Sequence, residues 1–191
     1  MRSLRVFVAV AARGAVRQAI VSLQARFADV SQTSNVRWTN PEQLHLTLRF
    51  LGNVPREQIG ELGTALHRAC IGVKKFEIDI EELICFPTPQ RPRIIWASVA
   101  KGAAPLTALA ERVRAETTGF GDSADSKPFV PHLTIGRSKA TGTTGHRLSD
   151  LIGHENPIRF GTLAVSEVLL LSSERAGDGS RYSLLGSETL A

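Results

Sequence analysis

Two stretches of the chain carry the same pattern of a histidine, an apolar residue and a threonine. The first is His45-Leu46-Thr47, and the second, eighty-seven residues later, is His132-Leu133-Thr134. In an extended strand alternate side chains point to the same face, so each histidine shares a face with its threonine, while the leucine points the other way. Each copy therefore predicts a strand with its apolar face in a core and an imidazole and a hydroxyl turned to a cleft.

One such triplet occurs by chance in many proteins, and a lone histidine on a strand is more often structural or merely exposed. The repetition favours function, because two strands of one protein seldom carry the same polar pair at their solvent-facing positions by chance. An imidazole, with an unperturbed pKa of roughly 6.5, can act as base or acid near neutral pH. Two of them on one substrate can divide these roles, one activating a nucleophile and the other protonating a leaving oxygen.

This division of roles suits the cleavage of a phosphodiester by water. Threonine hydroxyls and nearby arginines can hold the oxygens on which charge builds, and no metal ion is required. A metal site made of His45 and His132 alone would be two ligands short. The chain contains no P-loop and no Gly-x-Ser-x-Gly nucleophile motif, and Cys70 and Cys85 lack a catalytic signature. We expect both cysteines to be buried, reduced thiols.

Composition is that of one globular domain spanning residues 1–191, or of two small lobes with a common core. The net charge is +5, and 18 of the 23 basic residues are arginines, which favours an anionic partner such as a nucleotide or nucleic acid. A genome rich in G and C would also raise the arginine content. No apolar run approaches the roughly 20 residues of a membrane helix. We expect a cytoplasmic monomer without membrane contact.

Hydrophobic spacing predicts the elements that must position the two motifs. Amphipathic helices are predicted after Gly14, Pro55 and Pro105; the first carries a stripe of residues Val16, Ile20, Leu23, Phe27 and Val30. Strands are predicted at residues 4–10, 36–38, 44–52, 76–80, 94–99, 131–137, 163–171 and 181–185. Short strands that follow one another, with few helices between them, indicate an α+β fold with mainly antiparallel pairing. One motif in each half suggests two pseudo-symmetric lobes that face each other across a central cleft.

Two further segments are predicted to be loops. Residues 85–93 contain three prolines, which should keep them out of a central sheet. Arg91 and Arg93 on this loop could line a phosphate site or simply sit on a solvated loop tip. Residues 138–147 lack periodicity, and their threonines and glycines favour a mobile loop.

Nearly the whole chain resembles the 2H phosphoesterases, and within them the RNA 2′,3′-cyclic phosphodiesterases, also called 2′-5′ RNA ligases. Both histidine motifs and their flanks carry the resemblance, at residues 5–9, 36–52, 86–87, 91–96, 129–137, 166–173 and 181–185. It implies two lobes around a basic cleft, no cofactor, and hydrolysis of RNA 2′,3′-cyclic phosphate ends to 2′-phosphomonoesters. The ligase name describes the same chemistry with an RNA 5′-hydroxyl in place of water.

The resemblance also implies roles for individual residues. His45 would donate a proton to the leaving oxygen, and His132 would accept one from water. Thr47 and Thr134 would bind the phosphate, and Arg137 would contact RNA phosphate. The chain departs from many relatives at residues 172–173, where Ser-Ser replaces Arg-Ser. A different class of protein stays open, a nucleotide- or RNA-binding module that kept the fold without turnover; the intact histidines and threonines in both copies argue against it.

Overall fold

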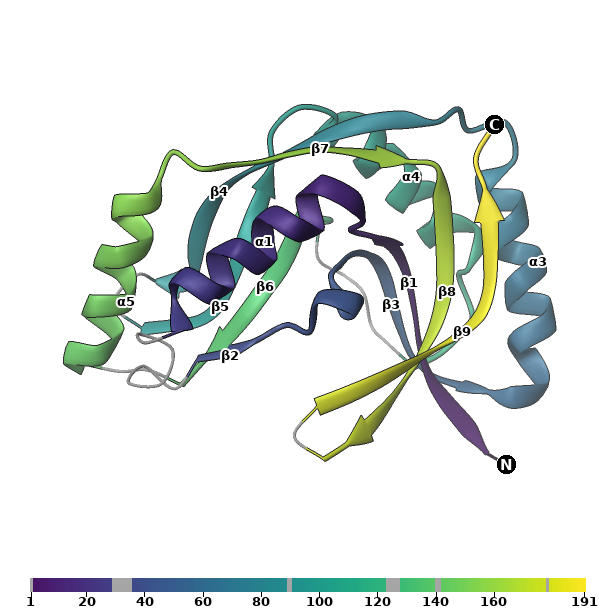
Figure 1. Ribbon diagram of the computed structural model, residues 1–191. Coiled ribbons are helices and arrows are strands. Elements are labelled where there is room, and N and C mark those ends of the chain that lie inside the picture. Colours follow the sequence, from purple (N-terminus) through teal and green to yellow (C-terminus); the bar gives the residue numbers. More distant parts are fainter. Residues whose placement is uncertain (1, 29–35, 89–90, 123–127, 140–141, 178) are drawn as a thin grey trace.

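Two antiparallel sheets form the framework of the protein (Figure 1). A computed structural model describes residues 2–28, 36–88, 91–122, 128–139, 142–177 and 179–191. The four-stranded sheet has the order β3 (His45–Pro55), β1 (Ser3–Ala11), β8 (Glu167–Ala176) and β9 (Gly179–Thr189). The five-stranded sheet has the order β2 (Val36–Trp38), β6 (His132–Ser138), β5 (Arg91–Val99), β4 (Phe76–Thr88) and β7 (Arg159–Val165). The predicted α+β class with mainly antiparallel pairing is confirmed.

Helices flank both sheets. They are α1 (Gly14–Arg26), α3 (Ile59–Cys70), α4 (Ala103–Glu116) and α5 (Gly142–Glu155), with short 3₁₀ turns η1 (Pro41–Gln43) and η2 (Arg56–Gln58). Helices α3 and α4 pack against each other beside the four-stranded sheet, α1 lies against β7, and α5 packs on β4 and β5 (Figure 1). None of the helices in the described parts of the chain combines the length and apolar character that crossing a membrane requires.

The predicted apolar stripe of the first helix is buried as far as the structure describes it. Val16, Ile20, Leu23 and Phe27 are each at most 1 % exposed, although α1 itself ends at Arg26. Val30, the last residue of the predicted stripe, lies outside the described residues.

The prediction that residues 85–93 form a loop outside the sheet was wrong for the residues that the structure describes. β4 runs to Thr88 and β5 starts at Arg91, and Pro87 pairs with Pro92. The outer neighbours of these two strands do not reach this segment, because β7 pairs with β4 only as far as Glu81 and β6 pairs with β5 only from Ile94 onward. Pro87 and Pro92 therefore lie in a two-stranded extension, where a missing N–H removes no bond to a third strand.

The prediction of a loop over residues 138–147 was wrong from Gly142, where α5 begins. The helix is stabilised by tertiary packing, since Leu148 and Ile152 are 0 % and 4 % exposed and face the core. Burial of this face outweighs the weak helix propensity of glycine and threonine. The single strand predicted over residues 163–171 is two strands, because the chain leaves the five-stranded sheet after Val165 and enters the four-stranded sheet at Glu167.

Candidate active site

The two histidine motifs lie at the starts of two strands from different sheets. His45 begins β3, His132 begins β6, and these two strands contact each other. Leu46 and Leu133, which alternate with the motif residues, are completely buried. Each buried leucine stabilises its strand by about 1.5–3 kcal/mol, so the core fixes which face the histidines and threonines occupy.

Each imidazole is held by the same local contact. Nδ1 of His45 lies 2.6 Å from the carbonyl oxygen of Gln43, and Nδ1 of His132 lies 2.8 Å from that of Val130. A carbonyl oxygen only accepts, so both Nδ1 atoms carry a proton and donate it. In the neutral ring Nε2 is then the unprotonated nitrogen. Among the described residues, neither Nε2 has a hydrogen-bond partner, so both can exchange a proton with a bound substrate.

Aromatic rings cover the two histidines unequally. The His45 ring lies 5.1 Å from the ring of Phe7 and 5.5 Å from that of Tyr182, which meets it edge-on. The His132 ring is 4.3 Å from the ring of Trp96. Such rings orient an imidazole and exclude water from one side of it.

Burial lowers the pKa of both histidines below the ordinary value of 6.5. For His45, burial outweighs the hydrogen bond to the Gln43 carbonyl, which raises the pKa, and the nearby charge of His132 lowers it further. For His132, burial again outweighs the hydrogen bond to the Val130 carbonyl, and the Arg137 guanidinium adds to the lowering of the pKa. The repulsion between the two rings shows that they share one electrostatic environment.

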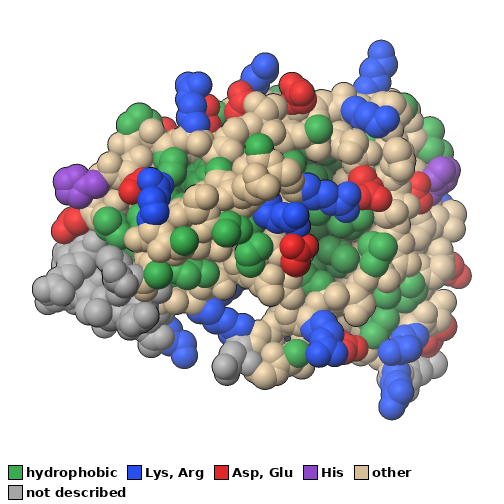
Figure 2. Space-filling model, in the orientation of Figure 1, with side chains coloured by type: hydrophobic (Ala, Val, Ile, Leu, Met, Phe, Trp, Pro, Cys, Tyr) green, Lys and Arg blue, Asp and Glu red, His purple; other side chains and the backbone are tan. Residues whose placement is uncertain are grey.

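A cavity of about 660 Å³ gathers the predicted phosphate-binding residues. His45, Thr47, Thr134 and Arg137 line it, while His132, two residues before Thr134 on the same strand, is not among the lining side chains. Among the described residues, the cavity wall contains no carboxylate and includes Arg5, Phe7, Thr39, His45, Thr47, Phe50, Thr134, Arg137, Ser173, Arg175, Ser180 and Tyr182. Figure 2 shows an opening through the lower part of the molecule with Lys and Arg side chains beside it.

A bulge in each motif strand determines which side chain comes next on the cleft face after the threonine. Pairing with neighbouring strands skips Leu48 in β3 and Ile135 in β6. Strict alternation would place the residue three positions after each threonine on the opposite face, and the bulge returns it to the cleft. Phe50 and Arg137 consequently occupy equivalent positions in the two lobes, and both line the cavity. This correspondence extends the pseudo-symmetry of the two motifs.

Several residues that line the cavity were missed by sequence reasoning. Arg5 and Phe7 come from the first strand, and the Arg5 guanidinium lies 4.8 Å from the centre of the Phe50 ring. Arg175 and Tyr182 come from the β8–β9 hairpin. Alternation along these strands could have indicated a shared face, but only the pairing of β1 with both β3 and β8 identifies that face as the cleft.

The region where the chain departs from many of its relatives is also part of this wall. Ser172 is 4 % exposed and donates to the Ser183 carbonyl oxygen at 3.4 Å, whereas Ser173 lines the cavity. Arg175, two residues further along β8, brings a guanidinium to the same wall.

The remaining candidates lie outside the cleft. Arg91 and Arg93 are exposed at the start of β5 and do not line the cavity. Cys70 is buried and Cys85 half-buried, and burial raises the pKa of each thiol to about 11, which makes both unreactive near neutral pH. Within the described ranges, no group of three or more His, Cys, Asp or Glu side chains could hold a metal ion.

The two histidines lie on strands that contact each other, near threonines and arginines, and comparison with known proteins assigns the family. The chain belongs to the LigT-like phosphoesterases, since the family model described as LigT like Phosphoesterase matches residues 10–96 and 98–182.

Curated relatives cover most of the chain. A protein of Archaeoglobus fulgidus named RNA 2′,3′-cyclic phosphodiesterase is 31 % identical over 179 residues, which is 94 % of this chain and 96 % of that protein. A protein of Aeropyrum pernix with the same name is 33 % identical over 144 residues, 75 % of this chain and 80 % of its own.

Solved structures agree with this assignment. A Thermus thermophilus protein superposes with a TM-score of 0.79 at 29 % identity, with 98 % of each chain covered. Escherichia coli LigT complexed with 3′-AMP superposes with a TM-score of 0.76 at 25 % identity, with 99 % of each chain covered.

Proposed function

We propose that this chain hydrolyses the 2′,3′-cyclic phosphate at the end of an RNA to a 2′-phosphomonoester. Water attacks the phosphorus, the bond from phosphorus to the ribose 3′-oxygen breaks, and that oxygen leaves as a hydroxyl. The observation that carries the proposal is the matched pair of imidazoles, each with Nδ1 bonded to the carbonyl two residues earlier and Nε2 left for substrate. The relatives named RNA 2′,3′-cyclic phosphodiesterase support the substrate.

The two histidines divide the proton transfers in this proposal. His132 accepts a proton from the attacking water, and His45 donates one to the leaving 3′-oxygen. His45 lines the cavity beside Phe7 and Tyr182, which supports its assignment to the leaving oxygen of a nucleotide bound there.

Thr47, Thr134 and Arg137 bind the phosphate in this account. Their hydroxyl and guanidinium groups face the same cavity as His45, and no carboxylate of the described residues lines that cavity to repel an anion. As charge develops on the non-bridging oxygens, these donors stabilise it without a metal ion.

An RNA 5′-hydroxyl in place of water would make the same site a 2′-5′ RNA ligase. The attacking hydroxyl loses its proton to His132, the 3′-oxygen leaves with a proton from His45, and a 2′-5′ phosphodiester forms. The proposal therefore includes ligation as a second outcome of one mechanism, in competition with hydrolysis.

The test is incubation with cytidine 2′,3′-cyclic phosphate in excess EDTA, followed by chromatographic separation of the two phosphate isomers. We expect cytidine 2′-phosphate as the product, at a rate that EDTA leaves unchanged. The double variant His45→Ala, His132→Ala, purified in the same way, controls for contaminating nucleases. Absence of turnover, formation of the 3′-isomer, or activity lost with EDTA and restored by a divalent ion would contradict the proposal.

A further inference from the structure

A second cavity, of about 680 Å³, adjoins the one that His45, Thr47 and Thr134 line. The two cavities have part of their walls in common, namely Thr39, Arg137, Arg175, Ser180 and Tyr182. Arg37 and Gln43 line the second cavity and not the first, whereas His45, Thr47 and Thr134 line the first and not the second. The cleft therefore continues past the proposed reaction centre into space that a cyclic phosphate does not need.

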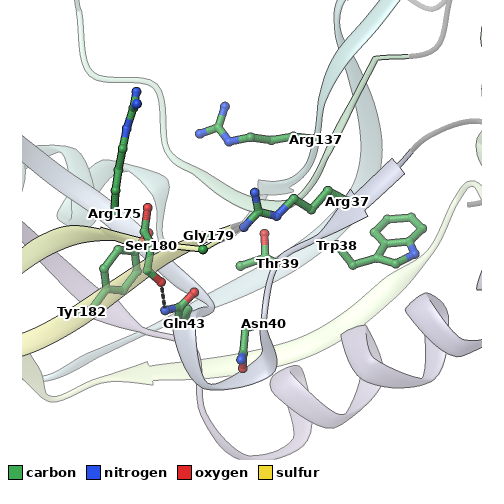
Figure 3. A pocket seen from close by; sticks show the side chains of 11 residues that line it. Arg37, Trp38, Thr39, Asn40, Gln43, Arg137, Arg175, Gly179, Ser180 and Tyr182 are labelled. Atoms are coloured by element: carbon green, nitrogen blue, oxygen red, sulfur yellow. Dashed lines mark hydrogen bonds between the residues drawn. The ribbon is translucent and has the colours of Figure 1, made fainter.

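Three arginines dominate this second cavity, and we call Arg37, Arg137 and Arg175 the arginine pocket. Figure 3 shows Arg175 rising from one side of the hollow and Arg37 and Arg137 extending from the other. No acidic residue in the described parts of the chain lines the cavity. Three guanidinium groups around one hollow favour an anion that comes from outside the chain.

Some arginines elsewhere in the described structure have carboxylate partners. Five of them make ion pairs with glutamates, at distances of 2.8 to 3.4 Å; they are Arg13, Arg17, Arg26, Arg68 and Arg159. Within the part of the chain that the structure describes, no member of the arginine pocket has such a carboxylate partner.

The pocket is assembled from both sheets. Arg37 comes from β2, at the edge of the five-stranded sheet, and Arg175 comes from β8 of the four-stranded sheet. The Arg37 guanidinium lies so close to Gly179 that a Cβ there would stand 2.5 Å from its Nη2. Near it, the Gln43 side chain donates to the Ser180 carbonyl oxygen at 2.5 Å (Figure 3). Gly179 and Ser180 of the β8–β9 hairpin therefore lie beside Arg37 of β2 and Gln43 of η1.

We propose that the arginine pocket binds the phosphodiester that precedes the terminal nucleotide, so that the enzyme acts on RNA chains in preference to cyclic mononucleotides. The inference rests on the proposed function, in which the cyclic phosphate occupies the adjoining cavity. A chain that ends in a 2′,3′-cyclic phosphate continues from the 5′-oxygen of its last ribose, and its next phosphate is the nearest additional anion. Arg137 lines both cavities and stands between the two phosphates.

The experiment compares kcat/KM for cytidine 2′,3′-cyclic phosphate with kcat/KM for a six-nucleotide RNA that ends in the same group. Wild type should prefer the RNA. Arg37 lines the second cavity and not the first, so Arg37→Gln should lower kcat/KM for the RNA on the order of tenfold, through KM, and leave the mononucleotide unchanged. Arg175 lines both cavities, so Arg175→Gln should lower kcat/KM more for the RNA than for the mononucleotide. Arg159→Gln removes the same charge at the far edge of the five-stranded sheet and should change neither value.

Salt dependence gives a second reading. Each lost contact with a phosphate should reduce the slope of log kcat/KM against log salt by about 0.7 for single-stranded RNA. The reduction should occur in the Arg37→Gln and Arg175→Gln variants and not in Arg159→Gln.

The possible outcomes separate this inference from the proposed function. Equal kcat/KM for both substrates in wild type, or equal losses on both substrates in the arginine variants, would overturn the inference while hydrolysis itself stands. If neither substrate is turned over, the proposed function fails, and the pocket is then tested by fluorescence anisotropy with a labelled hexanucleotide that ends in a 2′-phosphate. Unchanged affinity in both arginine variants would overturn the pocket in that case.

Discussion

Removing the aromatic cover of one histidine at a time should change opposite sides of the pH profile. The productive state in the proposed mechanism has His45 protonated and His132 neutral, so kcat/KM should follow a bell. Its limbs belong to the coupled pair, because the charge of His132 lowers the pKa of His45. At alkaline pH the rate is proportional to the fraction of protonated His45, and at acid pH to the fraction of neutral His132.

Burial is the largest cause of the lowered pKa of each histidine, and different rings provide the cover. Tyr182→Ala opens the side of His45 that now meets an aromatic edge at 5.5 Å. The pKa of His45 should rise toward about 6.5, the alkaline limb should move to higher pH, and the bell should widen. Trp96→Ala removes the ring 4.3 Å from His132. The pKa of His132 should rise, the acid limb should move to higher pH, and the bell should narrow.

The pKa of each histidine should rise no further than its ordinary value of about 6.5, which limits how far each limb can move. A rise of one pH unit changes the rate on the affected limb tenfold, about 1.4 kcal/mol, while the rate on the other limb stays the same. Initial rates on cytidine 2′,3′-cyclic phosphate from pH 4.5 to 9 would measure both limbs, with thermal melting to show that each variant is folded. Tyr182→Phe and Trp96→Phe keep an aromatic ring and serve as controls. Movement of the same limb in both alanine variants would refute the assignment of roles.

Further predictions concern binding and stability. Thr47→Val and Thr134→Val keep the β-branched shape and should each lower kcat/KM by an amount that corresponds to about 1–3 kcal/mol of lost transition-state stabilisation. Wild-type kinetics in both variants would show that neither threonine binds the phosphate. Arg49 is 8 % exposed and donates to the Arg114 carbonyl at 2.6 Å and to Thr117 Oγ1 at 2.7 Å, so Arg49→Leu should lower the free energy of unfolding in urea by about 1–3 kcal/mol, and an unchanged midpoint would contradict this. Because the folded pKa of both histidines lies below 6.5, the unfolded chain binds protons first as pH falls. The free energy of unfolding should therefore decrease below about pH 6.5, and it should decrease less in the double variant His45→Gln, His132→Gln than in wild type. Equal decreases in the two proteins would contradict the lowered pKa values.

The amino-acid sequence predicts which faces of the motif strands meet the cleft, because alternation is a local property. Because Leu46 and Leu133 are buried, the histidine and threonine on either side of each leucine must lie on the opposite face of the strand; these residues are His45 and Thr47, and His132 and Thr134. The bulges at Leu48 and Ile135 are not local in this sense, since they appear only when β3 and β6 pair with their neighbours. Arg137 is consequently on the cleft face although simple alternation places it on the other.

Residues far apart in the sequence complete the site, and their arrangement follows from the order of strands in the sheets. Arg5, Arg175 and Tyr182 reach the cavity because β1 pairs with both β3 and β8, and β8 with β9. No short motif marks these residues. The helix at Gly142–Glu155 was missed for a related reason, because its stability comes from packing on β4 and β5 and its own propensity is weak.

The division of roles between the two histidines is tested most directly by changing the leaving group. His45→Ala and His132→Ala should each lower kcat for cytidine 2′,3′-cyclic phosphate by on the order of 10²–10⁴-fold in the presence of EDTA. On a p-nitrophenyl phosphodiester of a nucleoside, whose leaving group needs little protonation, His45→Ala should recover much more of the wild-type rate than His132→Ala. Equal recovery would contradict the assignment, and near wild-type rates for either variant on the cyclic phosphate would contradict two-histidine catalysis.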